Sequence, residues 1–383
     1  MVAPAFQVCQ AKPAPRCYTR NGFNNTRQII RTDSTRSSII DIVDGLRGIA
    51  ILLVMYHHIV SIDVVRHVPY LFGQGWLGVN IFFALSGFVL FLPYRMHERT
   101  LESWSDVKAF YVRRFFRLYP LLLVSCTVSV LIKGVTPENL WQWVEIVTTL
   151  WLFTGTEIGP PLNWVLWSLQ LEVWFSLLFP LAVWSIRRFG YVKTGLVIAV
   201  GALSVRVAAA WLYPSHGVTV TPNPLANSFI SRFDDFFVGM IICHLFHQGR
   251  PPFHRSSLLY LGLGGGAALA AIVGWDLVWH DVMPFWVAPL LNNIFQVGMF
   301  FLIMAALKGT VLLTDLCKMW WLRIHGAMCF SLFVWHGALF GLFPRVWIYV
   351  LSFYLVSLVS YRVIEFGHAK DVSALFRLTP RVP

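Results

Sequence analysis

Long apolar runs repeat along the chain from about residue 48 to residue 364, and short polar segments separate them. Each run is close to the roughly 20 residues that an α-helix needs to cross the hydrocarbon core of a bilayer. No polar block between the runs is long enough to form a separate soluble domain. The pattern predicts an all-α, polytopic membrane protein with about ten transmembrane helices in one bundle. The predicted spans are 48–65, 75–92, 117–133, 163–185, 191–212, 228–247, 257–275, 285–307, 326–344 and 346–364.

The composition excludes a single water-soluble globule, because 57% of the residues are hydrophobic and only 13% are charged. The net charge of +12 comes from 30 Lys and Arg against 18 Asp and Glu, and the basic residues gather at the ends of apolar runs. With the N-terminus in the cytoplasm, the basic residues of the outer loops are Arg66, Lys133 and Arg345 alone. The positive-inside rule therefore predicts a protein of the plasma (inner) membrane with both termini cytoplasmic. Since the basic excess follows the membrane topology, no nucleic-acid partner is expected.

The stretch from Leu140 to Phe153 is apolar and rich in Trp, so it could be an eleventh span. If it crossed the membrane, Arg187, Arg188 and Lys193 would fall on the outer side. That placement conflicts with the positive-inside rule. The charge pattern therefore favours an interfacial or re-entrant segment on the outer side.

The polar ends of the chain divide it into three parts. Residues 1–38 are polar and basic and lack the apolar segment of a secretory signal, so we expect a disordered cytoplasmic arm at the membrane surface. Residues 39–366 form the predicted membrane domain, and residues 367–383 form a cytoplasmic tail. The six cysteines are scattered without the spacing of metal ligands, which predicts neither disulfides nor a metal site.

The first span carries ionisable residues in a helical pattern, and such residues inside a membrane are functional candidates by default. Arg47 and His58 are eleven positions apart, which leaves about 20° between their directions and a rise of about 16 Å. Asp44 shares this stripe, whereas His57 is turned away by about 80°. A buried imidazole is largely neutral and can accept a proton, so His58 is a candidate general base. A histidine that only packs between helices is the structural alternative.

Other polar residues also fall inside predicted spans. Glu172 lies in the fourth span and His336 in the ninth, and a lone buried glutamate is either protonated or paired with a cation. The run of Arg232, Asp234 and Asp235 in the sixth span is interpreted as a self-neutralised interfacial cluster. Two histidines, a glutamate and an arginine exceed what packing needs. Together they indicate a proton-handling site or a translocation path.

A basic and aromatic patch ends the loop between the second and third spans. One helical turn would gather Arg113, Arg114 and Arg117 beside Tyr119. Such a patch suits a polyphosphate and an adenine ring. An anchor held by anionic lipid explains the same residues equally well.

Five motifs follow one another along the chain. They are Asp44-Gly-Leu-Arg47-Gly-Ile-Ala with His58, Gly75-Trp-Leu-Gly78-Val-Asn80-Ile-Phe-Phe-Ala-Leu-Ser86-Gly-Phe, Arg113-Arg-Phe-Phe-Arg117-Leu-Tyr119-Pro, Trp167-Ser-Leu-Gln-Leu-Glu172 and Ser331-Leu-Phe-Val-Trp-His336. This series resembles the membrane acyltransferase-3 family over about residues 40–366. The resemblance implies transfer of an acyl group, most often acetyl, from acyl-CoA to a hydroxyl. The implied acceptor is a carbohydrate or glycolipid, such as an exopolysaccharide, lipopolysaccharide or oligosaccharide, or a secondary metabolite.

The resemblance also implies roles for individual residues. Arg47 and His58 correspond to the family's catalytic signature, and Glu172 and His336 match its later motifs, which completes the candidate catalytic set. The acyl-CoA co-substrate would bind the set Arg113, Arg114, Arg117 and Tyr119.

The sequence departs from the family pattern at two positions. His57 stands where the family has an apolar or aromatic residue, so either His57 or His58 can be the base. Near the C-terminus, Gly367 replaces a proline in the motif that begins at Ser360 and includes Glu365. Direct transfer and an acyl-enzyme intermediate both stay open. Alternative functions are a proton-coupled glycolipid transporter or flippase, and a structural subunit of an export complex.

Overall fold

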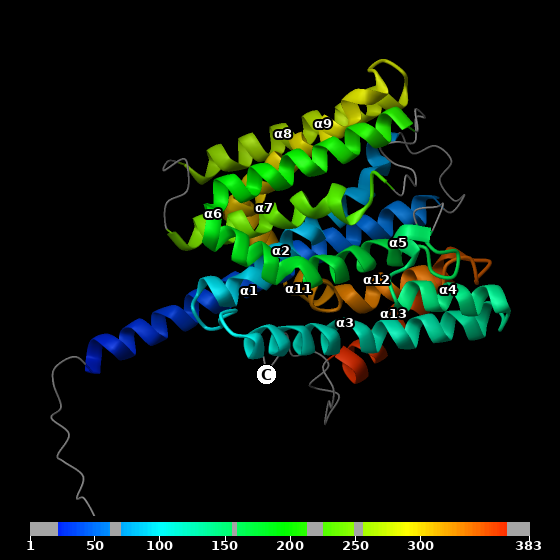
Figure 1. The fold of residues 1–383 in the computed structure, drawn as a ribbon, viewed down its shortest axis with the longest axis horizontal. Coiled ribbons are helices and arrows are strands. Elements are labelled where there is room, and N and C mark those ends of the chain that lie inside the picture. Colours follow the sequence, from blue (N-terminus) through cyan, green and yellow to red (C-terminus); the bar gives the residue numbers. More distant parts are fainter. Residues whose placement is uncertain (1–21, 62–69, 155–158, 213–224, 249–255, 366–383) are drawn as a thin grey trace, which may run out of the picture. The chain divides into compact units, whose positions relative to one another are not determined.

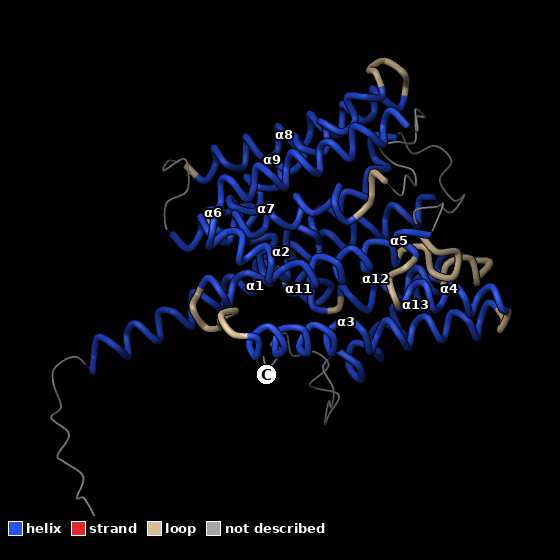
Figure 2. The backbone as a smooth tube through the Cα atoms, viewed as in Figure 1, coloured by secondary structure: helices blue, strands red, loops and turns tan. Residues whose placement is uncertain are grey.

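The structure is a computed structural model that describes residues 22–61, 70–154, 159–212, 225–248 and 256–365. Every regular element in these ranges is a helix, and no strand occurs in them (Figure 2). The predicted all-α class is confirmed. The chain separates into residues 1–40 and residues 41–383, and the contacts described below belong to the second unit.

Six helical segments in the described residues are long and apolar enough to cross a membrane, which makes the protein polytopic. In Figure 1, α8 and α9 lie side by side, as do α2 and α7. The elements that form the six segments are η1 (Tyr70–Leu77) with α2 (Gly78–Arg95), α3 (Trp104–Lys133), α6 (Leu166–Leu212), α8 (Ser257–Trp279), η3 (Phe285–Val287) with α9 (Ala288–Leu307), and α13 (Val346–Ser360) with η4 (Tyr361–Glu365).

Each of the ten predicted spans contains helix, but the count of ten stays a prediction. The fourth and fifth spans form the single element α6, which is broken at Gly190. The φ of 83° at Gly190 lies in the left-handed region, which glycine adopts without a steric penalty. The first, sixth and ninth spans fall on α1 (Gly22–Ser61), α7 (Phe229–Gln248) and α12 (Cys329–Ala338).

Helix α1 begins at Gly22, inside the range that the sequence predicts to be a disordered arm. Residues 22–38 are therefore helical, whereas residues 1–21 and the predicted tail 367–383 lie outside the described residues. The boundaries of the three predicted parts stay predictions.

The Trp-rich stretch that begins at Leu140 does not form one long helix. It contains most of α4 (Pro137–Val147) and the short α5 (Trp151–Thr154). With eleven residues, α4 is about 16 Å long, too short to cross the hydrocarbon core. This agrees with the interpretation that the stretch does not span the membrane. Two further short helices, α10 (Val311–Lys318) and α11 (Trp320–Ala327), connect α9 to α12.

Candidate active site

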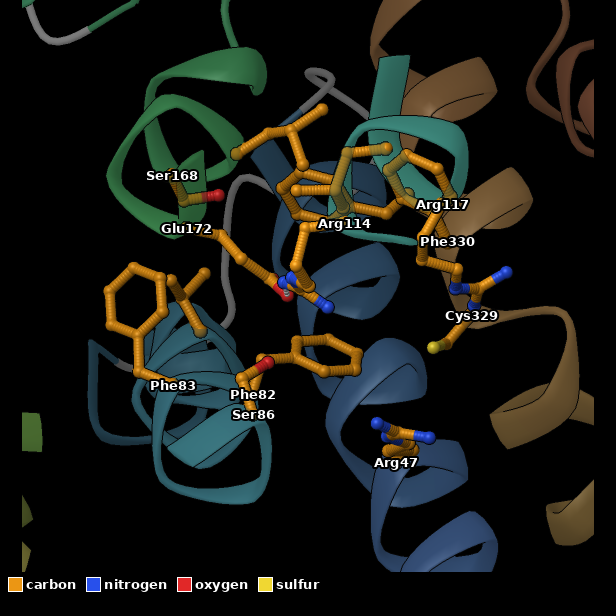
Figure 3. Close-up of a pocket in the computed structure, with 14 residues that line it drawn as sticks. Arg47, Phe82, Phe83, Ser86, Arg114, Arg117, Ser168, Glu172, Cys329 and Phe330 are labelled. Atoms are coloured by element: carbon orange, nitrogen blue, oxygen red, sulfur yellow. Dashed lines mark hydrogen bonds and ion pairs between the residues drawn. The ribbon is translucent and has the colours of Figure 1, made fainter. Parts of the chain in front are cut away.

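A cavity of about 100 Å³ lies between α1, α2, α3, α6 and α12 (Figure 3). Helices α2, α3, α6 and α12 each contribute one face, because their lining positions recur three and four residues apart, and α1 contributes Arg47. On α2 these positions include Phe82, Phe83 and Ser86, and on α3 they are Arg114, Arg117 and Leu118. We call this cavity the arginine pocket. Its charged lining residues are Arg47, Arg114, Arg117 and Glu172.

Glu172 is paired on the wall of the arginine pocket. The Nη2 atom of Arg114 donates to Oε1 of Glu172 at 2.8 Å, and its Nε atom donates to Ser176 Oγ at 3.0 Å. Ser176 and Glu172 lie one turn apart on α6. Figure 3 shows the Arg114 and Glu172 side chains pointing toward each other. Of the two forms that the sequence left open, protonated or paired, the structure has the paired one, and the cation comes from α3.

Arg117 connects α3 to the end of the described chain. Its Nη1 atom donates to Oε2 of Glu365 at 2.7 Å. The other oxygen of Glu365 accepts from the backbone N–H of Ser331 at 3.1 Å and from the Ser331 hydroxyl. Ser360 donates to the same Ser331 hydroxyl at 3.1 Å. The C-terminal motif thus positions Arg117 in the pocket through Glu365.

The first motif brings α1 close to its neighbours. A side chain at Gly45 would collide with the backbone of Cys317, and one at Gly48 would collide with the backbone of Leu322. Asp44 precedes Arg47 by one helical turn, and its Oδ1 atom lies 3.8 Å from Nη1 of Arg47. The two glycines allow this close packing, and Asp44 helps to orient the guanidinium that faces the pocket.

The two candidate histidines meet directly, although they are 278 positions apart. His58 Nδ1 lies 2.8 Å from His336 Nε2. Both rings are buried, and the ring of Trp164 lies edge-on to His58 with centroids 4.3 Å apart. The Nδ1 atom of His336 lies 3.0 Å from the carbonyl oxygen of Leu332. We call His58 and His336 the histidine pair.

The arginine pocket and the histidine pair lie along the same two helices. On α1, Arg47 lines the pocket and His58 is three turns further on, about 16 Å away. On α12, Cys329 and Phe333 line the pocket, and His336 follows on the same face. The rings of Phe333 and His336 have centroids 5.6 Å apart. Phe333 therefore lies between the arginine pocket and the histidine pair.

Arg113 and Tyr119, two of the four residues predicted to bind acyl-CoA, lie outside the pocket lining. Arg113 is exposed, and its Nη2 atom is 3.5 Å from the hydroxyl of Tyr94. Tyr119 stacks on Phe115 with centroids 4.6 Å apart. Spacing within one turn indicates which side chains are near each other, but it does not indicate which side of α3 faces the protein interior. His57 is half-buried, with its ring centroid 5.2 Å from that of His58.

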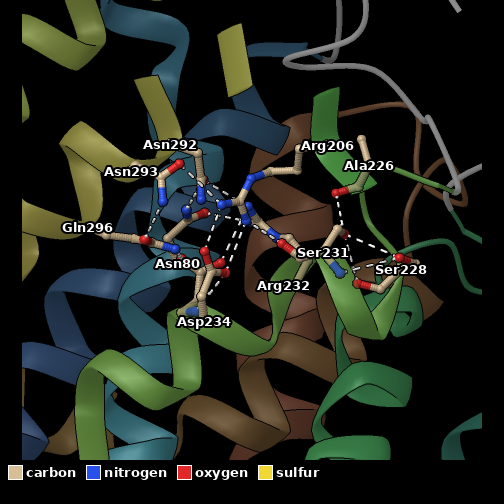
Figure 4. Close-up of polar contacts among 11 residues, drawn as sticks. Asn80, Arg206, Ala226, Ser228, Ser231, Arg232, Asp234, Asn292, Asn293 and Gln296 are labelled. Atoms are coloured by element: carbon tan, nitrogen blue, oxygen red, sulfur yellow. Dashed lines mark hydrogen bonds and ion pairs between the residues drawn. The ribbon is translucent and has the colours of Figure 1, made fainter. Parts of the chain in front are cut away.

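A second charged cluster, the buried polar network, joins α2, α6, α7 and α9 (Figure 4). Arg206 holds Asp234 through two hydrogen bonds of 2.6 and 3.0 Å. The Nη1 atom of Arg232 lies 3.4 Å from Oδ2 of Asp235. The Arg232 guanidinium also donates to the amide oxygens of Asn80 and Asn292. The predicted cluster of Arg232, Asp234 and Asp235 has one carboxylate more than it has guanidinium groups, and Arg206 on α6 supplies the second cation. The cluster is buried among helices. The remaining members drawn in Figure 4 include Asn293 and Gln296.

Sequence reasoning assigned no role to three groups that the structure brings to the site. Glu365 lies in the C-terminal motif in which Gly367 replaces a proline, but its partner Arg117 is 248 positions away in the sequence. Phe333 and Trp164 are ordinary apolar residues in a membrane helix pattern. Their position beside the histidine pair is a tertiary contact, for which the sequence has no local signal.

The helices and the enclosed polar site define an integral membrane protein with ionisable groups inside its bundle. A family model described as an acyltransferase domain, Acyl_transf_3, matches residues 40–368. The chain therefore belongs to this acyltransferase family, which confirms the resemblance seen in the motifs.

Two of the curated relatives that match most of this chain illustrate the activity stated in their names. The O-acetyltransferase OatA of Staphylococcus aureus (strain NCTC 8325 / PS 47) is 26% identical, and the match covers 88% of this chain and 58% of the relative. The peptidoglycan O-acetyltransferase OatA of Listeria monocytogenes serovar 1/2a is 23% identical, with coverage of 88% and 56%. The chain thus spans less than two thirds of the length of these relatives. No solved structure matches the chain.

Proposed function

We propose that this protein is an acyl-CoA-dependent O-acyltransferase that moves an acyl group, acetyl in the first instance, to a carbohydrate hydroxyl. The family supports acyl transfer, and the names of the relatives support O-acetylation and a carbohydrate polymer as acceptor. The protein would lie in the plasma (inner) membrane with both termini in the cytoplasm, as its basic residues predict.

The arginine pocket is the proposed donor site. Three guanidinium groups line it, and each of them has one carboxylate partner and carries several N–H donors. Guanidinium groups bind phosphate oxygens through paired, charge-assisted hydrogen bonds. Arg47, Arg114 and Arg117 would hold the phosphates of CoA at the cytoplasmic side. The acyl thioester would then extend past Phe333 toward the histidine pair.

The histidine pair supports His58 as general base through its hydrogen bonds. A carbonyl oxygen only accepts, so His336 Nδ1 carries the proton that is shared with Leu332. Neutral His336 then accepts at Nε2, and His58 donates to it from Nδ1. Neutral His58 therefore has its lone pair on Nε2, the atom that would take the acceptor's proton. His336 acts as the positioning residue that fixes this tautomer.

The proposed reaction is a direct transfer. As His58 removes the proton, the acceptor oxygen attacks the thioester carbonyl, the new C–O bond forms, and the C–S bond breaks. The CoA thiolate leaves and the proton from His58 returns to it, so charge balances.

The observation that carries this proposal is the placement of an arginine pocket and a buried histidine pair along the same two helices. The test is thioester consumption by the purified full chain with acetyl-CoA, measured as free thiol with and without candidate glycans. Release of thiol that depends on glycan, with a mass gain of one acetyl group per site on the glycan, is the expected result. Movement of glycolipid across vesicles without loss of thioester would support the transporter instead.

A further inference from the structure

A larger cavity lies apart from the proposed donor site, between the two halves of α6 and the start of α7. Its volume is about 580 Å³, within the range of ligand-binding pockets. Leu178 and Leu181 line it before the break at Gly190, and Val197 and Ile198 line it after the break. We call this cavity the α6 groove. Its wall continues on α7 through Phe229, Ile230 and Phe233.

One end of the α6 groove is polar. Lys193 and Thr194 line it three and four residues after the break, and Ser185 lines it on the opposite helix half. Lys193 is exposed, and in the described ranges no carboxylate forms an ion pair with it. The Thr194 side chain is buried, and its hydroxyl lacks a hydrogen-bond partner among the described residues. An apolar slot thus ends in an exposed cation and a buried hydroxyl with unused hydrogen-bonding capacity.

We propose that the α6 groove binds one anionic glycerophospholipid, with an acyl chain between the two halves of α6 and the phosphate at Lys193. In a bilayer, apolar surface between helices is covered by lipid chains, and a cation at a helix end lies at headgroup level. Charge complementarity therefore favours an anionic headgroup over a zwitterionic one.

The site is separate from the proposed donor site. The two linings have no residue in common, and the α6 groove contains none of the charged residues of the arginine pocket. Lipid binding in the groove can therefore succeed or fail whatever the enzymatic activity proves to be.

The test measures lipid retention on the purified full chain by native mass spectrometry. Detergent-solubilised protein is incubated with phosphatidylglycerol or phosphatidylcholine of the same acyl chains. We expect one retained phosphatidylglycerol and a preference of about fivefold over phosphatidylcholine, the factor expected from one basic residue at the headgroup.

Two variants and two matched controls locate the bound lipid. Lys193→Gln should remove the headgroup preference, and Gly201→Leu should remove retention by filling the groove. Gly201 lines the groove, and a side chain there meets no atom within 4 Å, so the variant is expected to fold. Arg188→Gln and Gly266→Leu on α8 are the controls, because both residues are exposed, lie outside the groove lining, and Gly266 has the same open space.

Equal retention of both lipids would overturn the proposal, as would a Gly201→Leu protein that keeps its lipid. Displacement of phosphatidylglycerol by an equal concentration of oleate would also overturn it, since the occupant would then be a free fatty acid.

Discussion

Two groups of arginines inside the bundle differ in how far their side chains are exposed. In the buried polar network, the Arg206 and Arg232 side chains are each 5% exposed and carboxylates balance them. In the arginine pocket each arginine also has a carboxylate partner, but the Arg47, Arg114 and Arg117 side chains are 25%, 18% and 39% exposed. Closed charge pairs hold helices together, whereas charge pairs that line a reachable cavity can also bind a ligand.

The largest expected effect separates chemistry from folding. His58→Ala removes the proposed base and should lower turnover roughly 10²–10⁴-fold, while the protein keeps its abundance in the membrane and its melting temperature. His57→Ala is the matched control and should retain most of the activity. Turnover is measured by thiol release from acetyl-CoA. Retention of a tenth of the activity by His58→Ala would contradict this role, and the reverse pattern would assign the base to His57.

The second largest effect is expected from a variant of the buried polar network, which we expect to stabilise the fold and to take no part in the reaction. Arg232→Met leaves Asp235 buried without its cation, which should lower the free energy of unfolding by about 3–5 kcal/mol. Thermal unfolding in detergent measures this loss. Arg188→Met, at an exposed position, should leave the melting temperature unchanged. A changed KM for acyl-CoA with unchanged stability would show that the network is part of the active site.

A smaller effect tests the pocket as the donor site. Arg114→Gln should raise the KM for acyl-CoA by roughly tenfold to a hundredfold, because a charge-assisted hydrogen bond is lost, with little change in kcat. Arg113→Gln is the control, since Arg113 lies outside the pocket lining. An equal rise in KM for Arg113→Gln would favour the assignment from sequence spacing over the geometry of the structure.

The smallest effect is expected from loss of the ion pair between Arg117 and Glu365. Glu365→Gln keeps an acceptor for Ser331 but removes the charge that holds Arg117. We expect a rise of about fivefold in KM, since roughly 1 kcal/mol of charge-assisted bonding is lost. Steady-state kinetics with acetyl-CoA measures it. An unchanged KM would remove Glu365 from the account of the pocket.

The fold follows closely from local patterns in the sequence. Runs of about 20 apolar residues predict helices because backbone polar groups in a bilayer must be satisfied within the segment. The stripe of Arg47 and His58 follows from helical geometry alone. The pattern fails to indicate the helix from Gly22, where charged residues give no apolar signal.

The site could be predicted only as separate pieces. Each motif identifies candidate residues, and the structure brings together Arg114 with Glu172 and His58 with His336. These pairs join helices that are far apart in the sequence, so no spacing rule contains them. The side of α3 that faces inward also depends on packing against other helices, which separates Arg117 from Tyr119.

The most direct test of the account is the dissociation constant of coenzyme A for three purified proteins: the wild type, His58→Ala and the double variant Arg114→Gln/Arg117→Gln. Because the pocket binds the donor and the histidine pair performs the chemistry, His58→Ala should bind coenzyme A within twofold of wild type. The double variant should bind it at least about tenfold more weakly, since two charge-assisted contacts are lost. Weak binding by His58→Ala, or wild-type binding by the double variant, would contradict this division between the two regions.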